Sequence, residues 1–139
     1  MYIKRRLENP GLCVRLIFKR GKKMKYSNKM KQDLLTTYFF WVWAADTGLG
    51  KSEYPDWFRL AAMSHSCAFC EYFYCIEKGE NPCRKCPLNK ECVCGNTVDY
   101  NAYDFWVRHR NRFAQRKYYA GLIRDAIKEF LLKEKILRA

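Results

Sequence analysis

The sequence contains little histidine, which limits the chemistry open to it. Only two histidines occur among 139 residues: His65 beside a run of cysteines and His109 within an apolar stripe. Hydrolytic enzymes that use histidine as a general base place it beside an open metal position or a carboxylate. No sequence spacing pairs either histidine with Asp99 or Asp104. A small metal-dependent nuclease that uses His65 is therefore the third of three functional hypotheses.

Long apolar runs are also missing. The longest nearly uncharged stretch, 34–45, covers twelve residues, whereas a membrane-spanning helix needs about 20. This stretch suits a buried core helix, and we expect no membrane partner. The apolar run 12–18 is interrupted by Arg15 and precedes no small-residue cleavage site, so we expect no signal peptide. These features favour a cytoplasmic protein, with Met24 as an alternative start.

Acidic residues are few, with 14 Asp and Glu against 27 Lys and Arg, and the net charge is +13. Residues 1–32 carry a net +10, residues 33–104 a net −4 and residues 105–139 a net +7. Two basic segments favour a polyanionic partner, DNA or RNA, through phosphate neutralisation and counterion release. The alternative is a solvated surface that only aids solubility. The candidate phosphate contacts are Lys4, Arg5, Arg6, Lys19, Arg20, Lys22, Lys23, Arg108, Arg110, Arg112, Arg116 and Lys117.

Cysteine, in contrast, is abundant, and seven of the eight cysteines fall within residues 67–94. Cys67-Ala-Phe-Cys70 and Cys83-Arg-Lys-Cys86 are two Cys-x-x-Cys pairs separated by twelve residues. This spacing lets four thiolates converge on one tetrahedral zinc ion. Because thiols stay reduced in the cytoplasm, the paired spacing indicates metal ligands rather than disulfides. We predict one structural Zn²⁺ held by these four cysteines.

Further donors leave the ligand set open. Cys92, Cys94 and His65 lie within loop reach of the two pairs, and each is an alternative ligand. Six to eight donors are also enough for a second zinc ion, although the remaining spacings are less regular. Cys13 and Cys75 stand apart, and we expect both to be small buried apolar residues.

The periodicity of apolar residues predicts a mainly α single domain, residues 1–139, with a zinc knuckle at 64–98. The basic segment 1–26 is expected to be an N-terminal extension or a β-hairpin, and the class becomes α+β if the hairpin forms. The helical segment 28–63 precedes the knuckle. A long basic amphipathic helix is expected to follow it over 99–138.

The boundaries of these helices follow from capping signals. Ser27 or Asn28 is expected to cap an aromatic core helix that runs to about Ala45 and ends at the glycines of 47–50. A shorter helix is expected from the Pro55 region to about Met63. Apolar residues of the final helix form one stripe, and we expect this stripe to pack on the aromatic core helix. The candidate caps of that final helix are Asp99 and Asn101.

Two motif matches are interpreted as coincidental. Residues 45–52, Ala-Asp-Thr-Gly-Leu-Gly-Lys-Ser, satisfy a relaxed phosphate-loop pattern. That loop requires a buried strand before it, whereas an aromatic helix is expected here, so Lys51 and Ser52 are interpreted as ordinary loop residues. The run 82–86, Pro-Cys-Arg-Lys-Cys, matches half of a zinc-deaminase signature, but its His-x-Glu half is missing.

A string of short motifs resembles a known group of proteins. Its most specific elements are Cys67-x-x-Cys70-Glu-Tyr and Cys83-x-x-Cys86-Pro-Leu, accompanied in order by Trp41-Val-Trp43, Pro55-Asp-Trp57 and Tyr103-x-x-Trp106. Over about residues 30–125, this order resembles small cysteine-rich, zinc-binding proteins encoded by bacteriophages and prophages. The resemblance implies zinc binding, a viral origin and hence the host cell cytoplasm. It implies no particular activity.

Three functional hypotheses follow. The first is a non-catalytic, zinc-binding phage accessory protein that binds nucleic acid through a basic surface. The second is a phage protein that binds and modulates a host protein, a defence or transcription component, through exposed aromatic residues. The third is the small nuclease. The sequence leaves the oligomeric state open. The candidate aromatic contacts of the second hypothesis are Tyr2, Trp57, Tyr72 and Tyr74.

Overall fold

The computed structural model describes residues 25–63, 67–72, 87–90 and 101–138. These ranges contain helices and no strand, so the described chain is a mainly α single domain, as the sequence predicts. The expected hairpin within 1–26 lies outside the described residues, apart from the last two positions. The elements are α3 (Asn28–Thr47), η1 (Lys51–Glu53), α4 (Trp57–Ala61), α5 (Ala68–Tyr72), α6 (Pro87–Lys90), α7 (Ala102–Arg108) and α8 (Phe113–Lys133).

Helix α3 begins and ends where its sequence predicts. The Ser27 hydroxyl accepts a hydrogen bond from the Met30 amide at 3.2 Å, which satisfies one of the free N–H groups of the first turn. At the other end Gly48 adopts a left-handed conformation, with φ of 75°, and its N–H donates to the Ala44 carbonyl. A side chain at Gly48 would be strained and would crowd Phe113, because a Cβ there would lie 3.1 Å from the Phe113 Cβ.

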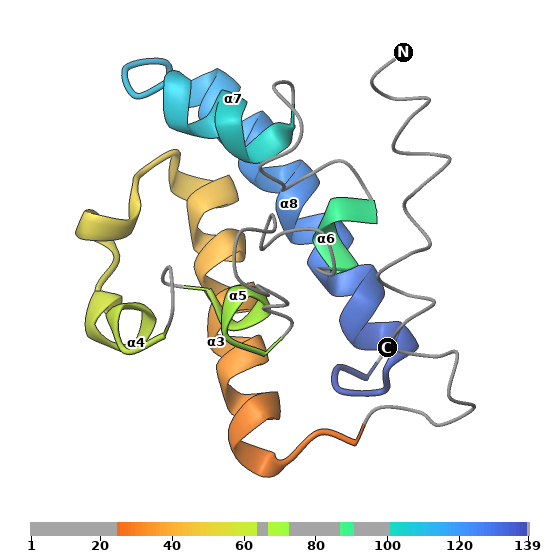
Figure 1. The fold of residues 1–139 in the computed structure, drawn as a ribbon. Helices are drawn as coiled ribbons and strands as arrows, with labels where there is room; N and C mark the ends of the chain where they lie inside the picture. The colour runs from red at the N-terminus through yellow and green to blue at the C-terminus, as the bar shows by residue number, and fades with distance from the viewer. Residues whose placement is uncertain (1–24, 64–66, 73–86, 91–100, 139) are drawn as a thin grey trace, which may run out of the picture.

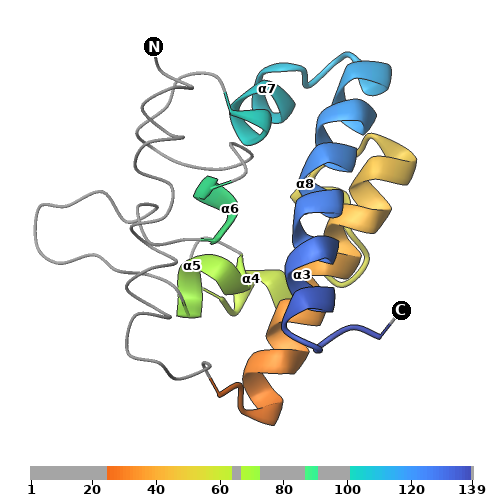
Figure 2. The same cartoon turned by 90° about the vertical axis from the view of Figure 1, so that its right-hand side faces the viewer.

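Helices α3 and α8 form an antiparallel pair that holds most of the core. The Tyr26 hydroxyl, before α3, donates to Glu134 just after α8 at 2.9 Å, while Gly48 meets Phe113 at the opposite end. Figure 1 shows the two helices running in opposite directions. Figure 2 shows α5, α6 and α7 together on one side of this pair. The expected packing of the final apolar stripe on the aromatic core helix is therefore confirmed.

The single long helix expected over 99–138 is wrong, because the chain turns between α7 and α8. Asn101 caps α7 as anticipated, since its side-chain oxygen accepts from the Asp104 amide at 2.9 Å. In one continuous helix Phe105 and Tyr119 would lie about 21 Å apart along the axis. Their rings instead stack with centroids 5.1 Å apart. The turn at 109–112 folds α7 back so that it packs against α8.

The centre of the core is an aromatic cluster around Phe40. The Phe40 ring is fully buried, and its centroid lies 4.9 Å from that of Trp41, 5.2 Å from that of Tyr54 and 6.2 Å from that of Trp106. All three contacts are edge-to-face. Edge-to-face contacts are favoured by the ring quadrupoles and add to the hydrophobic gain of burial. The cluster joins α3, the segment after η1 and α7, and it positions α7 on α3.

The region that resembles a phosphate loop lies at the carboxyl end of α3. This end of a helix presents carbonyl oxygens, whereas phosphate binding needs the amides of a helix amino end. Lys51 and Ser52 begin the short element η1 instead of a phosphate-cradling helix, in agreement with their interpretation as linking residues. Among the described helices, none is both long and apolar enough to cross a membrane.

Candidate metal centre and nucleic-acid interface

The first cysteine pair lies at the start of helix α5. Cys67 immediately precedes the helix, and Cys70 occupies its first turn, so the two-residue spacing returns both thiols to one side. Both side chains are partly buried and neither is in a disulfide. The intervening Ala68 and Phe69 are fully buried and fix the pair to the core. The two residues between the cysteines therefore attach this half of the predicted zinc site to the core.

The environment of Cys67 favours the thiolate form. A hydrogen bond with the Cys70 thiol lowers the pKa of Cys67 to about 6; burial opposes the shift, and the Cys70 amide, the Lys51 charge and the Phe69 amide assist it. Backbone amides that donate to sulfur stabilise negative charge there. Thiolate is also the form that binds zinc. The geometry of Cys67 therefore suits a metal ligand.

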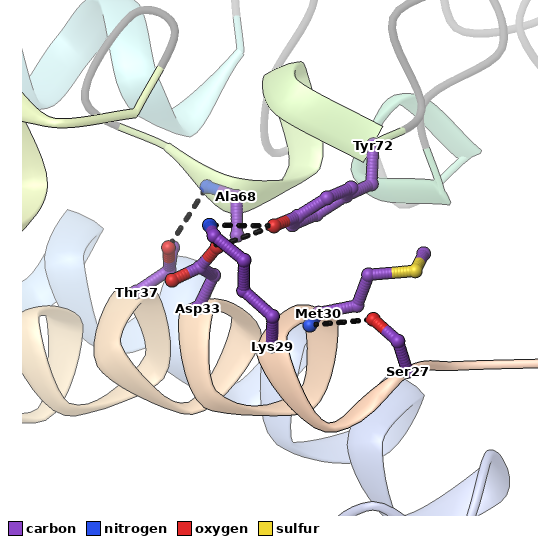
Figure 3. A network of polar contacts seen from close by, with 7 residues as sticks. All are labelled: Ser27, Lys29, Met30, Asp33, Thr37, Ala68 and Tyr72. Carbon is purple, nitrogen blue, oxygen red and sulfur yellow. Dashed lines mark hydrogen bonds and ion pairs between the residues drawn. The ribbon is translucent and has the colours of Figure 1, made fainter.

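Hydrogen bonds attach α5 to α3 (Figure 3). The Thr37 hydroxyl oxygen, fully buried on α3, accepts from the Ala68 amide at 2.9 Å. Further along, the Tyr72 hydroxyl donates to the Asp33 carboxylate, and the Lys29 ammonium donates to the same carboxylate at 2.7 Å. These contacts hold the Cys-x-x-Cys helix at a fixed position on α3. Nothing in the sequence singles out Thr37 or Asp33, because their hydrogen-bond partners on α5 are known only from the folded structure.

The Asp33 carboxylate is the charged centre of this network. Burial by itself would raise the pKa of Asp33, but hydrogen bonds from Lys29 and Tyr72 and the Lys29 charge outweigh it, so the pKa lies below its usual value. Because folding lowers this pKa, the network stabilises the fold at neutral pH. Its contribution is lost as the pH falls and the carboxylate is protonated.

Replacing Thr37 with valine tests the attachment of α5. The change keeps the shape of the side chain but leaves the Ala68 amide buried without its acceptor. We expect Thr37→Val to lower the free energy of unfolding by about 1–3 kcal/mol, measured by urea denaturation of the zinc-loaded protein. The neighbouring, half-buried Thr36 provides the control, since Thr36→Val makes the same chemical change at a position that does not bond to the Ala68 amide. Equal stability losses in the two variants would contradict the assigned role of Thr37.

The other predicted metal ligands lie outside the described residues. These are Cys83 and Cys86, with the alternatives Cys92, Cys94 and His65. Within the described ranges no group of three or more metal-binding side chains comes together. The four-cysteine site stays a prediction, and two of its four ligands, Cys67 and Cys70, lie in the described part of the chain. The nuclease hypothesis likewise depends on His65, outside these ranges.

Three of the predicted phosphate contacts come together at the turn between α7 and α8. Arg108 ends α7, Arg110 lies in the turn and Arg112 is the residue before α8. Together with Val107, His109 and Asn111 they line a hollow of about 450 Å³. Among the described residues, no carboxylate forms an ion pair with any of these three arginines. We call Arg108, Arg110 and Arg112 the arginine corner.

The amino end of α8 adds to the positive potential of this corner. The helix has 21 residues, no acidic residue in its first turn and no side-chain hydrogen bond from its cap residue, Arg112. Its first amides therefore carry the uncompensated positive end of the helix dipole. Lys117, one turn into α8, is exposed. Lys4, Arg5, Arg6, Lys19, Arg20, Lys22 and Lys23 lie outside the described residues.

Arg116 is placed differently from the other arginines. Its residue is only 8% exposed, and its guanidinium carbon lies 4.4 Å from the centre of the Trp106 ring, beside Gly50. Burial lowers the pKa of Arg116, the Glu53 charge opposes this shift and the Arg110 charge adds to it. Among the described residues, the Arg116 Nε has no hydrogen-bond acceptor. We therefore assign Arg116 to packing between α7 and α8 and exclude it from the arginine corner.

His109 lies between the arginine corner and a group of aromatic rings. Its Nδ1 is 2.6 Å from the Phe105 carbonyl oxygen, and its ring centroid is 5.5 Å from that of Tyr119. The sequence placed His109 on an apolar stripe, and the half-buried ring agrees with that position. Its place in the lining of the hollow was not foreseen, because the long helix expected there contained no turn.

Comparison with protein-family models, with curated proteins and with solved structures finds no match to this chain.

Proposed function

We propose that this chain is a non-catalytic, zinc-stapled phage accessory protein that binds nucleic acid through the arginine corner. One observation carries the proposal: three guanidinium groups surround a hollow at the uncapped amino end of a long helix, with no ion-pair partner among the described residues. Positive side chains that lack protein carboxylates remain available to phosphate oxygens. Helix amino ends add backbone amides as further donors.

The structural zinc has a supporting role in this proposal. The amide hydrogen bonds to Cys67 and the attachment of α5 to α3 suit one half of a structural zinc site. Such a site contributes to folding and performs no chemistry. The metal then stabilises the fold that presents the arginine corner.

Fluorescence anisotropy with labelled oligonucleotides across a salt series tests the nucleic-acid proposal. We expect the native protein to bind with an affinity whose logarithm falls linearly with the logarithm of salt concentration. The variant Arg108→Gln/Arg110→Gln/Arg112→Gln should lose affinity by more than about tenfold, and its salt slope should fall by about 2 to 3. Both changes follow from the loss of phosphate contacts.

A charge-matched variant separates a local site from general charge. Lys128→Gln/Lys133→Gln/Arg138→Gln removes the same number of positive charges from exposed positions near the far end of α8. We expect this control to retain most of the native affinity. Equal losses in the two variants would replace the arginine corner with non-specific attraction, and an absence of binding at moderate salt would overturn nucleic-acid binding itself.

The second hypothesis, binding of a host protein, has one observation in its favour. Trp57 and Phe58 are adjacent on α4, and each is more than half exposed. Large exposed aromatic residues are typical anchors of protein interfaces. A host complex that survives nuclease treatment and is lost in Trp57→Ala would favour this function over nucleic-acid binding.

A further inference from the structure

A group of aromatic rings from α7, the turn after it and α8 adjoins the arginine corner. The Phe105 and Tyr119 rings are stacked, with 19° between their planes, and the Tyr118 ring meets Tyr119 edge-on with centroids 5.2 Å apart. His109 lies 6.3 Å from Phe105 and 5.5 Å from Tyr119, measured between ring centroids. We call Phe105, His109, Tyr118 and Tyr119 the aromatic ladder.

The ladder is partly buried at its inner end and exposed at its outer end. Phe105, His109 and Tyr119 are partly buried between α7 and α8, whereas Tyr118 is 62% exposed. Ring contacts from Tyr119 orient the Tyr118 ring while leaving most of its surface in water. A flat, oriented and exposed aromatic ring is the surface on which an unpaired base stacks, and each such contact contributes substantially to single-strand affinity.

The aromatic ladder and the arginine corner are joined through His109. His109 belongs to the ladder and also lines the hollow with the three arginines. Phosphate-binding cations beside stacking rings are typical of proteins that bind single strands. In a duplex the bases are stacked on one another and present only their edges in the grooves, so a flat ring has no base face to contact. The combination therefore suits a single strand better than a duplex.

We propose that the arginine corner and the aromatic ladder together bind single-stranded nucleic acid, with phosphates in the hollow and an unpaired base on the Tyr118 ring. This inference rests on the proposed function and specifies the form of its ligand. The hollow is lined by consecutive residues of one turn, so the three arginines can meet a phosphate from the same side. The bases stack without regard to sequence, because every base has an aromatic face.

Substitution of Tyr118 tests the stacking contact. We expect Tyr118→Ala to weaken binding of a labelled single-stranded oligonucleotide by about fivefold or more, with an unchanged salt slope and an unchanged duplex affinity. Tyr118→Phe keeps the ring and should bind within about twofold of the native protein. Phe58→Ala, an exposed aromatic residue on α4, is the matched control and should bind as the native protein does. Because Tyr118 is exposed, the alanine variant should fold, which circular dichroism checks.

The outcomes separate the two proposals. A Tyr118→Ala protein that binds single strands as well as the native protein, or that loses single-strand and duplex affinity equally, overturns the stacking proposal. If the arginine variant still shows its reduced salt slope in that case, the nucleic-acid function stands without the ladder. If the native protein binds no nucleic acid, both proposals fail. If the native protein does bind, a comparison of its affinities for single-stranded DNA and single-stranded RNA shows whether it distinguishes deoxyribose from ribose.

Discussion

A Cys67→Ser protein is expected to contain less zinc than the native protein and to lose the cooperative folding of its cysteine region. The serine hydroxyl cannot replace a thiolate whose charge is stabilised by the Cys70 thiol and by the Cys70 and Phe69 amides. Structural zinc contributes its binding free energy to folding, about 10–16 kcal/mol in small zinc-finger peptides. We expect about one zinc ion per native chain by elemental analysis. The thermal unfolding midpoint should fall in the variant, and also in native protein treated with a chelator.

Further cysteine variants define the ligand set. Cys83→Ser should behave as Cys67→Ser does, while Cys75→Ser should retain its zinc, since Cys75 stands outside both pairs. Retention of zinc by Cys92→Ser and by Cys94→Ser would exclude these alternatives. Native protein that contains no zinc after reducing, zinc-supplemented purification would refute the metal site. A metal-free Cys83→Ser protein that still folded cooperatively would refute it as well.

Phe40→Ala is expected to lower the free energy of unfolding by about 3–5 kcal/mol. The ring is fully buried and touches aromatic partners from α3, from the segment after η1 and from α7. Its removal leaves a cavity that rigid rings cannot fill by small rotations, so both the lost burial and the cavity contribute. Urea denaturation of zinc-loaded protein, followed by helical circular dichroism, measures the change.

The adjacent residue supplies a close control for this prediction. Phe39 is on the same helix but is 52% exposed, and its ring meets only Tyr38 among the described aromatic residues. We expect Phe39→Ala to change the stability by less than about 1 kcal/mol. If Phe39→Ala proved as destabilising as Phe40→Ala, the assignment of the core face of α3 would be wrong.

The boundaries of α3 were predictable from sequence because local chemistry determines them. The Ser27 hydroxyl supplies an acceptor for a free amide of the first turn, and Gly48 adopts a positive φ that other residues reach only with strain. The pairing of α3 with the final apolar stripe was also predictable, since each helix has one face to bury. These conclusions need only short-range patterns and the hydrophobic effect.

The turn between α7 and α8 was not predictable from the same patterns. Both helices bury their apolar residues against the α3 side of the core, so the periodicity continues across residues 109–112 without a visible break. The turn contains no proline or glycine. Its position depends on the stacking of Phe105 on Tyr119 and the burial of Trp106, both of which are tertiary contacts.

At the candidate sites too, the sequence identified features that depend on local spacing and missed those that depend on tertiary contacts. The Cys67–Cys70 pair was identified by its spacing, whereas its attachment through Thr37 and Asp33 required knowledge of which helix lies beside it. In the basic segment, the sequence predicted both Arg112 and Arg116 to be phosphate contacts. Only the fold placed Arg116 over the Trp106 ring and left Arg112 beside the hollow.

The attachment of α5 to α3 has a consequence for the order in which the chain folds. The contact between Thr37 and Ala68 joins residues 31 apart in sequence, whereas the contact between Tyr26 and Glu134 joins residues 108 apart. Loop-closure entropy makes the longer-range contact slower to form. Docking of α5 first brings the downstream chain back to α3, so that α8 then closes a shorter loop. We therefore expect α5 to dock on α3 before α8 completes its packing on α3.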